Sequence, residues 1–283
     1  MINFCHISPT KHIGLYTQTN GAHLILAHLV EQDEEYATFY AKAFGKYKMM
    51  DNSAFEMFKQ NRPMYDSSKL IEMGNKCKAD CIVLTDYPRE DWIKTVQKAV
   101  DTVDDIIAAG FETFFVPQSV VGDLRGYIES IRWALNNPKI HRIGLSILGC
   151  PIALGLDEKK TKKERSDSYK LQRYLSRHKI LTELQNQNLL EKATKKFHCL
   201  GMTDGPNEIS LLKPFHKYIA SWDSSAAVWA GLNGIMFDNS PTGLIDGKFE
   251  KEVDFDFSLP TTDPKHSITY SNIQYIDKLA RSE

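Results

Sequence analysis

The chain has 283 residues, of which 42% are hydrophobic and 25% are charged, an ordinary balance for a folded globular protein. This length fits one large domain, such as an α/β barrel of about 250 residues, better than two full domains. The formal net charge is -1, so no overall field attracts nucleic acid, and any polyanion must meet a local basic patch.

The sequence carries no segment that we expect to target the chain to a membrane. Residues 1–14 hold no long apolar run of the kind found in signal peptides, and no stretch approaches the ~20 apolar residues of a membrane span. The five cysteines are odd in number and scattered, which is typical of a reducing compartment. We therefore expect a cytoplasmic protein with no membrane partner.

Short apolar runs alternate with longer amphipathic stretches along most of the chain. We expect helices at residues 92–109 and 124–136, and strands at residues 23–29, 47–51, 81–86, 113–118, 142–148, 197–202 and 218–223. Continuous apolar strands separated by helices indicate a parallel sheet that is covered on both faces. Seven such units, with an eighth strand near residues 234–237 or beyond, favour an α/β fold of the (β/α)8 TIM-barrel type.

An open doubly wound sheet is the competing fold. That fold commonly has a glycine-rich phosphate loop after its first strand, whereas Leu29 is followed here by Val30-Glu31-Gln32-Asp33-Glu34. We therefore predict a single barrel domain over residues 1–283, with a basic insertion at about 157–179 and a C-terminal extension at about 238–283. An alternating stretch at 253–259 in the extension predicts either closure of the barrel or a β extension.

Polar side chains stand at equivalent ends of four predicted strands. Each of these four residues follows an apolar or aromatic run. The residues are Asp51, Asp86, Gln118 and Asp223. TIM barrels place their active sites at the carboxyl ends of the strands. A lone aspartate after a strand usually caps the following helix, but two carboxylates at strand tips can also perform covalent glycosyl transfer, one as nucleophile and one as acid and base.

A run of charged residues at 157–179 interrupts the pattern after the fifth predicted strand. Such a run is often only a solvated helix or loop. Because it follows a strand on the same side as the carboxylates, it also predicts a rim that binds nucleic-acid phosphates. The candidate residues for that contact are Lys159, Lys160, Lys162, Lys163, Arg173 and Arg177.

Taken in order, short segments across about residues 45–237 resemble the queuine and archaeosine tRNA-guanine transglycosylase superfamily. Its members exchange guanine for a 7-deazaguanine base on a modified (β/α)8 barrel. The matching segments are Asp51-Asn52-Ser53-Ala54-Phe55-Glu56, Val83-Leu84-Thr85-Asp86, Phe115-Val116-Pro117-Gln118 followed by Asp123-Leu124-Arg125, Gly144-Leu145-Ser146-Ile147, His198-Cys199-Leu200-Gly201-Met202, and Trp222-Asp223 followed by Gly231-Leu232-Asn233-Gly234. Each motif is weak alone, and the specificity lies in their common order.

The resemblance implies a role for each strand-end residue. Asp223 is the implied nucleophile at C1′ of the target nucleoside, and Asp51 is the implied general acid and base. Asp86 and Gln118 would read a guanine-like edge, the carboxylate accepting from N1–H and the 2-amino group and the amide donating to O6. Further substrate contacts are implied for Ser53, Phe55 and Gly149. Because C1′ is buried in a helix stack, the target nucleotide must be flipped out or single-stranded.

The chain departs from the tRNA enzymes at several places, including Ala54 and Glu56 in the first motif and the loop after Ile147, and two further departures concern zinc and RNA. Their zinc site, Cys-x-Cys-x-x-Cys followed by His, comes after the nucleophile strand, whereas the last cysteine here is Cys199, so we expect no zinc subdomain and no metal. The arginines that engage RNA are replaced by Trp229 and Leu232. A chain with these departures most resembles the phage-type relatives that place 7-deazaguanine derivatives in DNA.

We therefore expect an enzyme that exchanges guanine in DNA for a 7-cyano-7-deazaguanine-type base, with no cofactor beyond this co-substrate, in the host cytoplasm if phage-encoded. Three alternatives stay open: exchange in tRNA, with residues 157–179 replacing the missing RNA contacts; a hydrolytic nucleoside or DNA glycosylase; and a non-catalytic nucleic-acid-binding subunit. The presence of both Asp51 and Asp223 argues against the last, because a scaffold needs neither carboxylate. A homodimer or a protein partner is also compatible with the sequence.

Overall fold

The structure, a computed structural model, describes residues 1–156, 166–202, 205–238, 240–244 and 252–281. Eight strands form one sheet in the order β1-β8-β7-β6-β5-β4-β3-β2, so the order follows the chain from β2 to β8 and then reaches β1. The pairs β1–β8, β3–β4, β4–β5 and β5–β6 are parallel. A doubly wound sheet would reverse its strand order at a switch point. The absence of a reversal confirms the predicted α/β fold of the (β/α)8 TIM-barrel type.

The chain divides into two compact units. Unit 1 comprises Met1–His23 and Cys199–Glu283, and unit 2 comprises Leu24–His198. Both boundaries fall within strands, β2 (Ala22–Leu26) and β7 (Phe197–Leu200), rather than in a linker.

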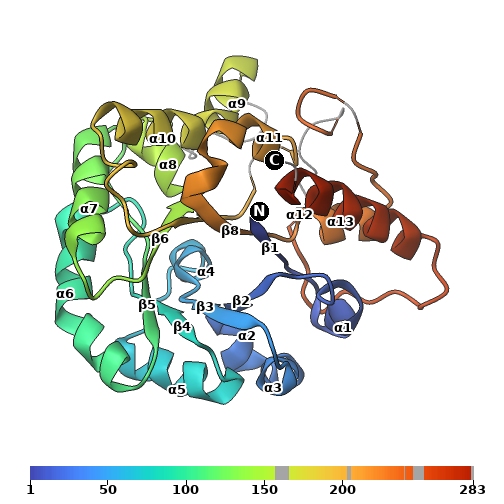
Figure 1. The fold of residues 1–283 in the computed structure, drawn as a ribbon. Helices are drawn as coiled ribbons and strands as arrows, with labels where there is room; N and C mark the ends of the chain where they lie inside the picture. The colour runs from blue at the N-terminus through green and yellow to red at the C-terminus, as the bar shows by residue number, and fades with distance from the viewer. Residues whose placement is uncertain (157–165, 203–204, 239, 245–251, 282–283) are drawn as a thin grey trace. The chain divides into compact units, whose positions relative to one another are not determined.

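Unit 2 alternates strands with helices along the chain. Its strands are β3 (Tyr47–Asp51), β4 (Cys81–Val83), β5 (Glu112–Phe115) and β6 (Arg142–Ser146). Its helices are α2 (Ala27–Gln32), α3 (Glu34–Lys42), α4 (Ala54–Lys59), α5 (Ser67–Cys77), α6 (Trp92–Ala108), α7 (Leu124–Asn136), α8 (Gly149–Ala153), α9 (Asp167–Tyr174) and α10 (Ser176–Asn186). Figure 1 shows α5, α6 and α7 on the outer side of strands β3 to β6.

Helices α5, α6 and α7 each begin directly after an aspartate that caps the helix. The carboxylates of Asp66, Asp91 and Asp123 each accept a backbone N–H from the first turn of α5, α6 and α7, respectively. Along α6, buried residues recur at helical spacing, at Thr95, Ala99, Thr102, Val103 and Ile106. This combination of cap and apolar stripe explains why the sequence predicted α6 to within one residue and α7 without error.

Unit 1 combines the beginning and the end of the chain. Its elements are β1 (Asn3–His6), the 3-10 helix η1 (Thr10–His12), α1 (Ile13–Tyr16), α11 (Glu208–Leu211), the 3-10 helix η3 (Lys213–Tyr218), β8 (Ile219–Ser224), α12 (Ala226–Leu232) and α13 (Lys265–Arg281). β1 pairs with β8, which places Cys5 beside Asp223. Within the described parts of the chain, no helix has both the length and the apolar content needed to cross a membrane.

The eighth strand differs from the one expected. The prediction placed it near residues 234–237, whereas β1 takes that position in the sheet and residues 234–237 form no strand. The Asn272 side chain of α13 instead accepts from the Phe237 amide at 2.8 Å and donates to the Ile235 carbonyl at 2.9 Å. A side-chain amide thus satisfies backbone groups that a neighbouring strand would otherwise bind.

The predicted β structure at residues 253–259 is also wrong. These residues form no strand, and the Phe257 ring packs edge-on against Trp229 of α12 with 5.3 Å between ring centroids. The backbone N–H of Leu259 donates to His12 Nε2 at 2.9 Å. The alternation in this segment therefore reflects individual side-chain contacts with unit 1 elements and not sheet pairing.

Helices α12 and α13 approach closely at Gly231. A Cβ there would lie 2.4 Å from Thr269 Cα and 2.7 Å from its backbone nitrogen, so the α13 backbone would have to move. We expect Gly231→Ala to lower the free energy of unfolding by about 1–3 kcal/mol, the usual cost of overpacking, measured by urea denaturation. Ser271→Ala, which alters an exposed residue of α13, is the control, with an expected change below about 0.5 kcal/mol. Equal stability of the two variants would contradict the close contact.

Candidate active site

The end of β3 and the start of α4 form a tight, polar turn. Asp51 is the last residue of β3, and its Oδ2 accepts from the Ser53 amide at 3.0 Å. Asn52 Oδ1 accepts from the Ala54 amide at 2.9 Å. Ser53 has φ 55° and ψ 32°, a left-handed conformation that is uncommon outside glycine and asparagine. Two successive side chains therefore fold back onto the backbone and fix the direction in which Asp51 leaves the strand.

Three strand ends of unit 2 share one hydrogen-bonded cluster. Asn52 Nδ2 donates to Asp86 Oδ1 at 2.6 Å, and Gln118 Nε2 donates to Asp86 Oδ2 at 2.5 Å. Asn52 Nδ2 also donates to the Leu84 carbonyl at 2.7 Å. All three side chains of the cluster belong to residues that are buried. The structure thus brings together two residues predicted to read the base, Asp86 and Gln118, beside the turn that holds Asp51.

Burial changes the protonation of Asp86. Desolvation raises the pKa of its carboxyl to about 6, against hydrogen bonds from Asn52 and Gln118 that lower it. A carboxyl with this pKa exchanges its proton near neutral pH, as functional groups in active sites commonly do. The charged form accepts two N–H donors, and the acidic form can also donate one.

The cluster has two polar atoms left over. Gln118 Oε1 and the adjacent Ser119 Oγ are buried and have no hydrogen-bond partner within the described residues. Buried polar atoms are nearly always paired, so atoms without a partner at a strand end point to a ligand or a water. The sequence predicted that the Gln118 amide donates to a base. One of its two N–H groups binds Asp86, and the amide oxygen, an acceptor, has no partner within the described residues.

Phe55 and Gly149 have different environments. Phe55 lies on α4, four residues after Asp51, and remains 46% exposed. Gly149 is buried at the start of α8, and its amide already donates to Ser146 Oγ at 2.7 Å. A Cβ at Gly149 would lie 3.0 Å from the Pro117 carbonyl oxygen. Phe55 is therefore open for stacking, whereas the lack of a side chain at Gly149 lets the Pro117 carbonyl, next to Gln118, approach closely.

Sequence reasoning missed His28 and assigned no role to Asn52. The His28 amide donates to Ser53 Oγ at 3.1 Å, and His28 Nδ1 lies 2.9 Å from the same oxygen. Burial and the Arg62 guanidinium lower the pKa of His28 to about 4, while Glu31 opposes the shift. His28 lay inside a run read as a strand, and its polarity within an apolar segment was the available signal. Asn52 lay within the Asp51 motif, but its contact joins it to Asp86, 34 residues further along the chain.

Asp223, the predicted nucleophile, lies in unit 1 on β8 and is buried. Its Oδ1 accepts from the Gly201 amide at 3.2 Å. The preceding residue, Trp222, donates from Nε1 to the Gly201 carbonyl at 2.7 Å. The predicted nucleophile and the predicted base-reading residues therefore belong to different units, and each set has its own local support.

The predicted phosphate rim falls largely outside the described residues. Lys159, Lys160, Lys162 and Lys163 lie there. Arg173 on α9 and Arg177 on α10 are buried, and Arg177 Nε donates to the Leu145 carbonyl at 2.9 Å. These two arginines thus occupy interior positions, whereas solvated positions were expected. The prediction failed because the charge pattern of a segment does not reveal which face of its helices packs inward. Within the described residues, no group of three or more His, Cys, Asp or Glu side chains is placed to hold a metal ion.

The raised pKa of Asp86 predicts how stability depends on pH. The folded protein holds this proton more tightly than the unfolded chain, whose aspartates titrate near 3.8, so stability falls as pH rises from about 4 to about 6. The loss is on the order of 3 kcal/mol, since one pKa unit corresponds to about 1.4 kcal/mol. We expect Asp86→Asn to remove this part of the pH dependence in urea unfolding at pH 4.5 and 7.5. Asp105→Asn, at an exposed position of α6, is the control, and an unchanged pH dependence in Asp86→Asn would contradict the assignment.

Comparison with known proteins gives no family for this chain. No protein-family model matches it, and no curated protein matches it. Among solved structures, it is similar to a protein from Coccidioides immitis provisionally assigned as a fructose-1,6-biphosphate aldolase, with 10% sequence identity and a TM-score of 0.43, over 98% of this chain and 88% of that chain. At this TM-score, the similarity gives no information about the activity of the chain.

Proposed function

We propose that the chain is a base-exchange transglycosylase that replaces guanine in DNA with a 7-deazaguanine base, through a covalent intermediate on Asp223. The observation that carries the proposal is the buried cluster of Asn52, Asp86 and Gln118 beside Asp51. The cluster gathers the residues proposed to read the base and to transfer protons, at three neighbouring carboxyl ends of strands, where barrel enzymes perform their chemistry.

The chemistry of the cluster matches the edge of a guanine-type base. Asp86 and the unpaired Gln118 Oε1 are acceptors, and guanine offers donors at N1–H and at its 2-amino group. The second N–H of the Gln118 amide can donate to O6. Adenine has no N1–H and presents an acceptor at N1, so it would leave a buried carboxylate facing a lone pair. Such a mismatch is costly in a site built around hydrogen bonds.

The proposed reaction has two displacements at C1′. An Asp223 carboxylate oxygen forms a bond to C1′ as the C1′–N9 bond breaks, and the leaving guanine takes the bonding electrons and a proton from Asp51. The incoming base then gives its N9 proton to Asp51, and its N9 forms a bond to C1′ as the bond to Asp223 breaks. Two inversions give retention at C1′, and Asp51 returns to its starting protonation state.

The choice of DNA is supported by two positions on α12. Trp229 and Leu232 stand where the resembling tRNA enzymes have arginines that engage RNA, and both are buried in unit 1. Trp229 contacts Phe257, so it belongs to the packing of unit 1. These positions therefore supply no phosphate contact, and the phage-type DNA enzymes are the better comparison.

The test is guanine release from guanine-labelled single-stranded DNA, duplex DNA and unmodified tRNA, each incubated separately with purified protein and 7-cyano-7-deazaguanine. We expect release from DNA that depends on the added base. Asp223→Asn is expected to lower the rate by at least ~10³-fold, because it removes the nucleophile. Asp256→Asn, at an exposed position in the same unit, is the control and should retain the wild-type rate.

Each of the other outcomes would indicate a different function for the protein. Release from tRNA alone would move the substrate to RNA. Release without an added base would indicate a hydrolytic glycosylase. Binding of nucleic acid with no release from any substrate would leave a non-catalytic subunit. Release by Asp223→Asn at the wild-type rate would remove the assigned nucleophile.

A further inference from the structure

His28 is buried near the start of α2, and two of its atoms contact the same oxygen, Ser53 Oγ. Its backbone N–H donates to Ser53 Oγ at 3.1 Å, and its Nδ1 lies 2.9 Å from that oxygen. Ser53 is fully buried as well. A hydroxyl has one proton to donate and two lone pairs to accept with. Ser53 Oγ can therefore accept from the amide and donate to Nδ1 when the imidazole is neutral.

Ser53 has to be held because its backbone conformation is unfavourable. A left-handed conformation at a residue with a Cβ costs free energy, and such residues persist only where their surroundings fix them. In this conformation the Ser53 amide donates to Asp51 Oδ2 at 3.0 Å. A change in the Ser53 backbone would therefore alter the hydrogen bond that orients Asp51. The contacts connect His28 to Ser53 and Ser53 to Asp51.

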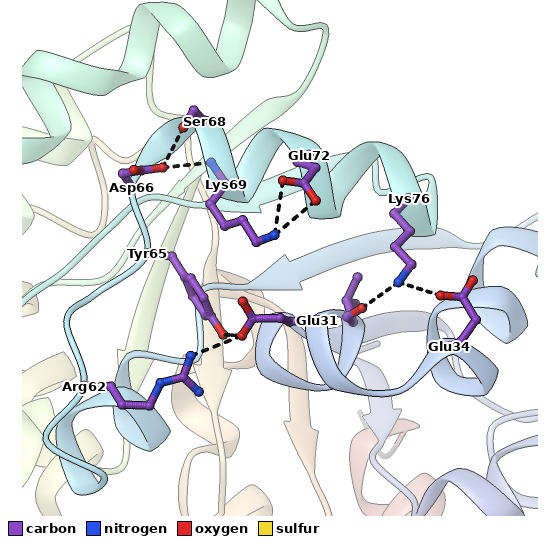
Figure 2. Close-up of polar contacts among 10 residues, drawn as sticks. Glu31, Glu34, Arg62, Tyr65, Asp66, Ser68, Lys69, Glu72 and Lys76 are labelled. Carbon is purple, nitrogen blue, oxygen red and sulfur yellow. Dashed lines mark hydrogen bonds and ion pairs between the residues drawn. The ribbon is translucent and has the colours of Figure 1, made fainter.

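Helix α2 also holds the far end of α4. Figure 2 shows Glu31 of α2 accepting hydrogen bonds from the Tyr65 hydroxyl at 2.5 Å and from Arg62 Nη2 at 3.2 Å. Residues 60–66 follow α4 directly, so α2 binds the chain both before and after this helix. The Tyr65 carbonyl in turn accepts from Thr85 Oγ1 at 2.7 Å, next to Asp86 in the sequence.

We infer that His28 is a positioning residue for Asp51. Through its contact with Ser53, His28 orients the Asp51 carboxylate toward the substrate. This inference rests on the base exchange proposed above. Burial and the Arg62 guanidinium favour the neutral imidazole, and the Glu31 carboxylate opposes them. In the neutral ring an Nδ1 without a proton accepts from the Ser53 hydroxyl. His28 itself transfers no proton to the substrate in this arrangement.

The test compares two substitutions that differ in which imidazole nitrogen they imitate. In His28→Asn the amide oxygen can lie near the position of Nδ1 and still accept from Ser53, whereas in His28→Gln the amide reaches toward the position of Nε2. We expect kcat for guanine exchange to fall roughly 10- to 100-fold in His28→Gln, the scale of a misaligned catalytic group, and KM for DNA to change less than ~3-fold. His28→Asn is expected to keep most of the wild-type kcat.

Ser53→Ala provides the second measurement. If both residues act through one contact, the double variant His28→Gln/Ser53→Ala should lose no more kcat than the more impaired single variant, so the effects are not additive. His141→Gln is the matched control, because His141 Nδ1 also lies near a hydroxyl, that of Thr113 at 3.0 Å, but directly before β6 and away from this turn. Thermal unfolding of each variant confirms that the rates refer to folded protein.

The outcomes separate this inference from the proposed function. Additive losses, or equal kcat for His28→Asn and His28→Gln, would overturn the positioning role while base exchange by the wild type still stands. If the wild type releases no guanine, the proposed function fails and the inference fails with it. Loss in His28→Gln, retention in His28→Asn and a non-additive double variant together support it.

Discussion

The local structure at the ends of β3, β4 and β5 depends on one constraint, the burial of the Asp86 carboxyl. A carboxylate removed from water is unfavourable unless donors replace the lost hydration. Asn52 and Gln118 provide those donors from the neighbouring strand ends, so the three strands must keep their register for the carboxyl to be satisfied. The requirement then extends to the turn after β3, because Asn52 can reach Asp86 only while the Asp51–Ala54 segment keeps its conformation.

Much of the fold could be predicted from the sequence, because the strands of unit 2 are apolar and its helices have regular stripes and caps. The bounds of β3 agree with the prediction. β1 was missed because its four residues begin and end with polar side chains, those of Asn3 and His6, and so form no continuous apolar run. α13 was missed because its buried face includes polar residues, namely His266, Thr269 and Asn272, which hide the hydrophobic period. The prediction of a strand at 234–237 was wrong for a related reason. The backbone there forms its hydrogen bond with the polar Asn272 side chain and not with another strand.

The candidate site was predictable to a similar extent. Asp51, Asp86 and Gln118 could be found because a polar residue after an apolar strand is conspicuous and strand ends converge. His28 could not be found in this way, because its role depends on a contact with Ser53, 25 residues away in the chain. The interior positions of Arg173 and Arg177 were also beyond sequence reasoning, since a dense run of charges gives no periodic apolar face to orient the helices.

Gly201 is held by two consecutive residues of β8. Its carbonyl accepts from the Trp222 indole and its amide donates to Asp223, while successive residues of a strand point to opposite faces. The Trp222 indole thus binds the carbonyl of this glycine, and the carboxylate of Asp223, the proposed nucleophile, binds its amide. A ligand that displaces the Asp223 carboxylate would take this acceptor away from the Gly201 amide. Hydrogen exchange at the Gly201 amide is therefore expected to respond to movement of the carboxylate, whether or not the protein forms a product.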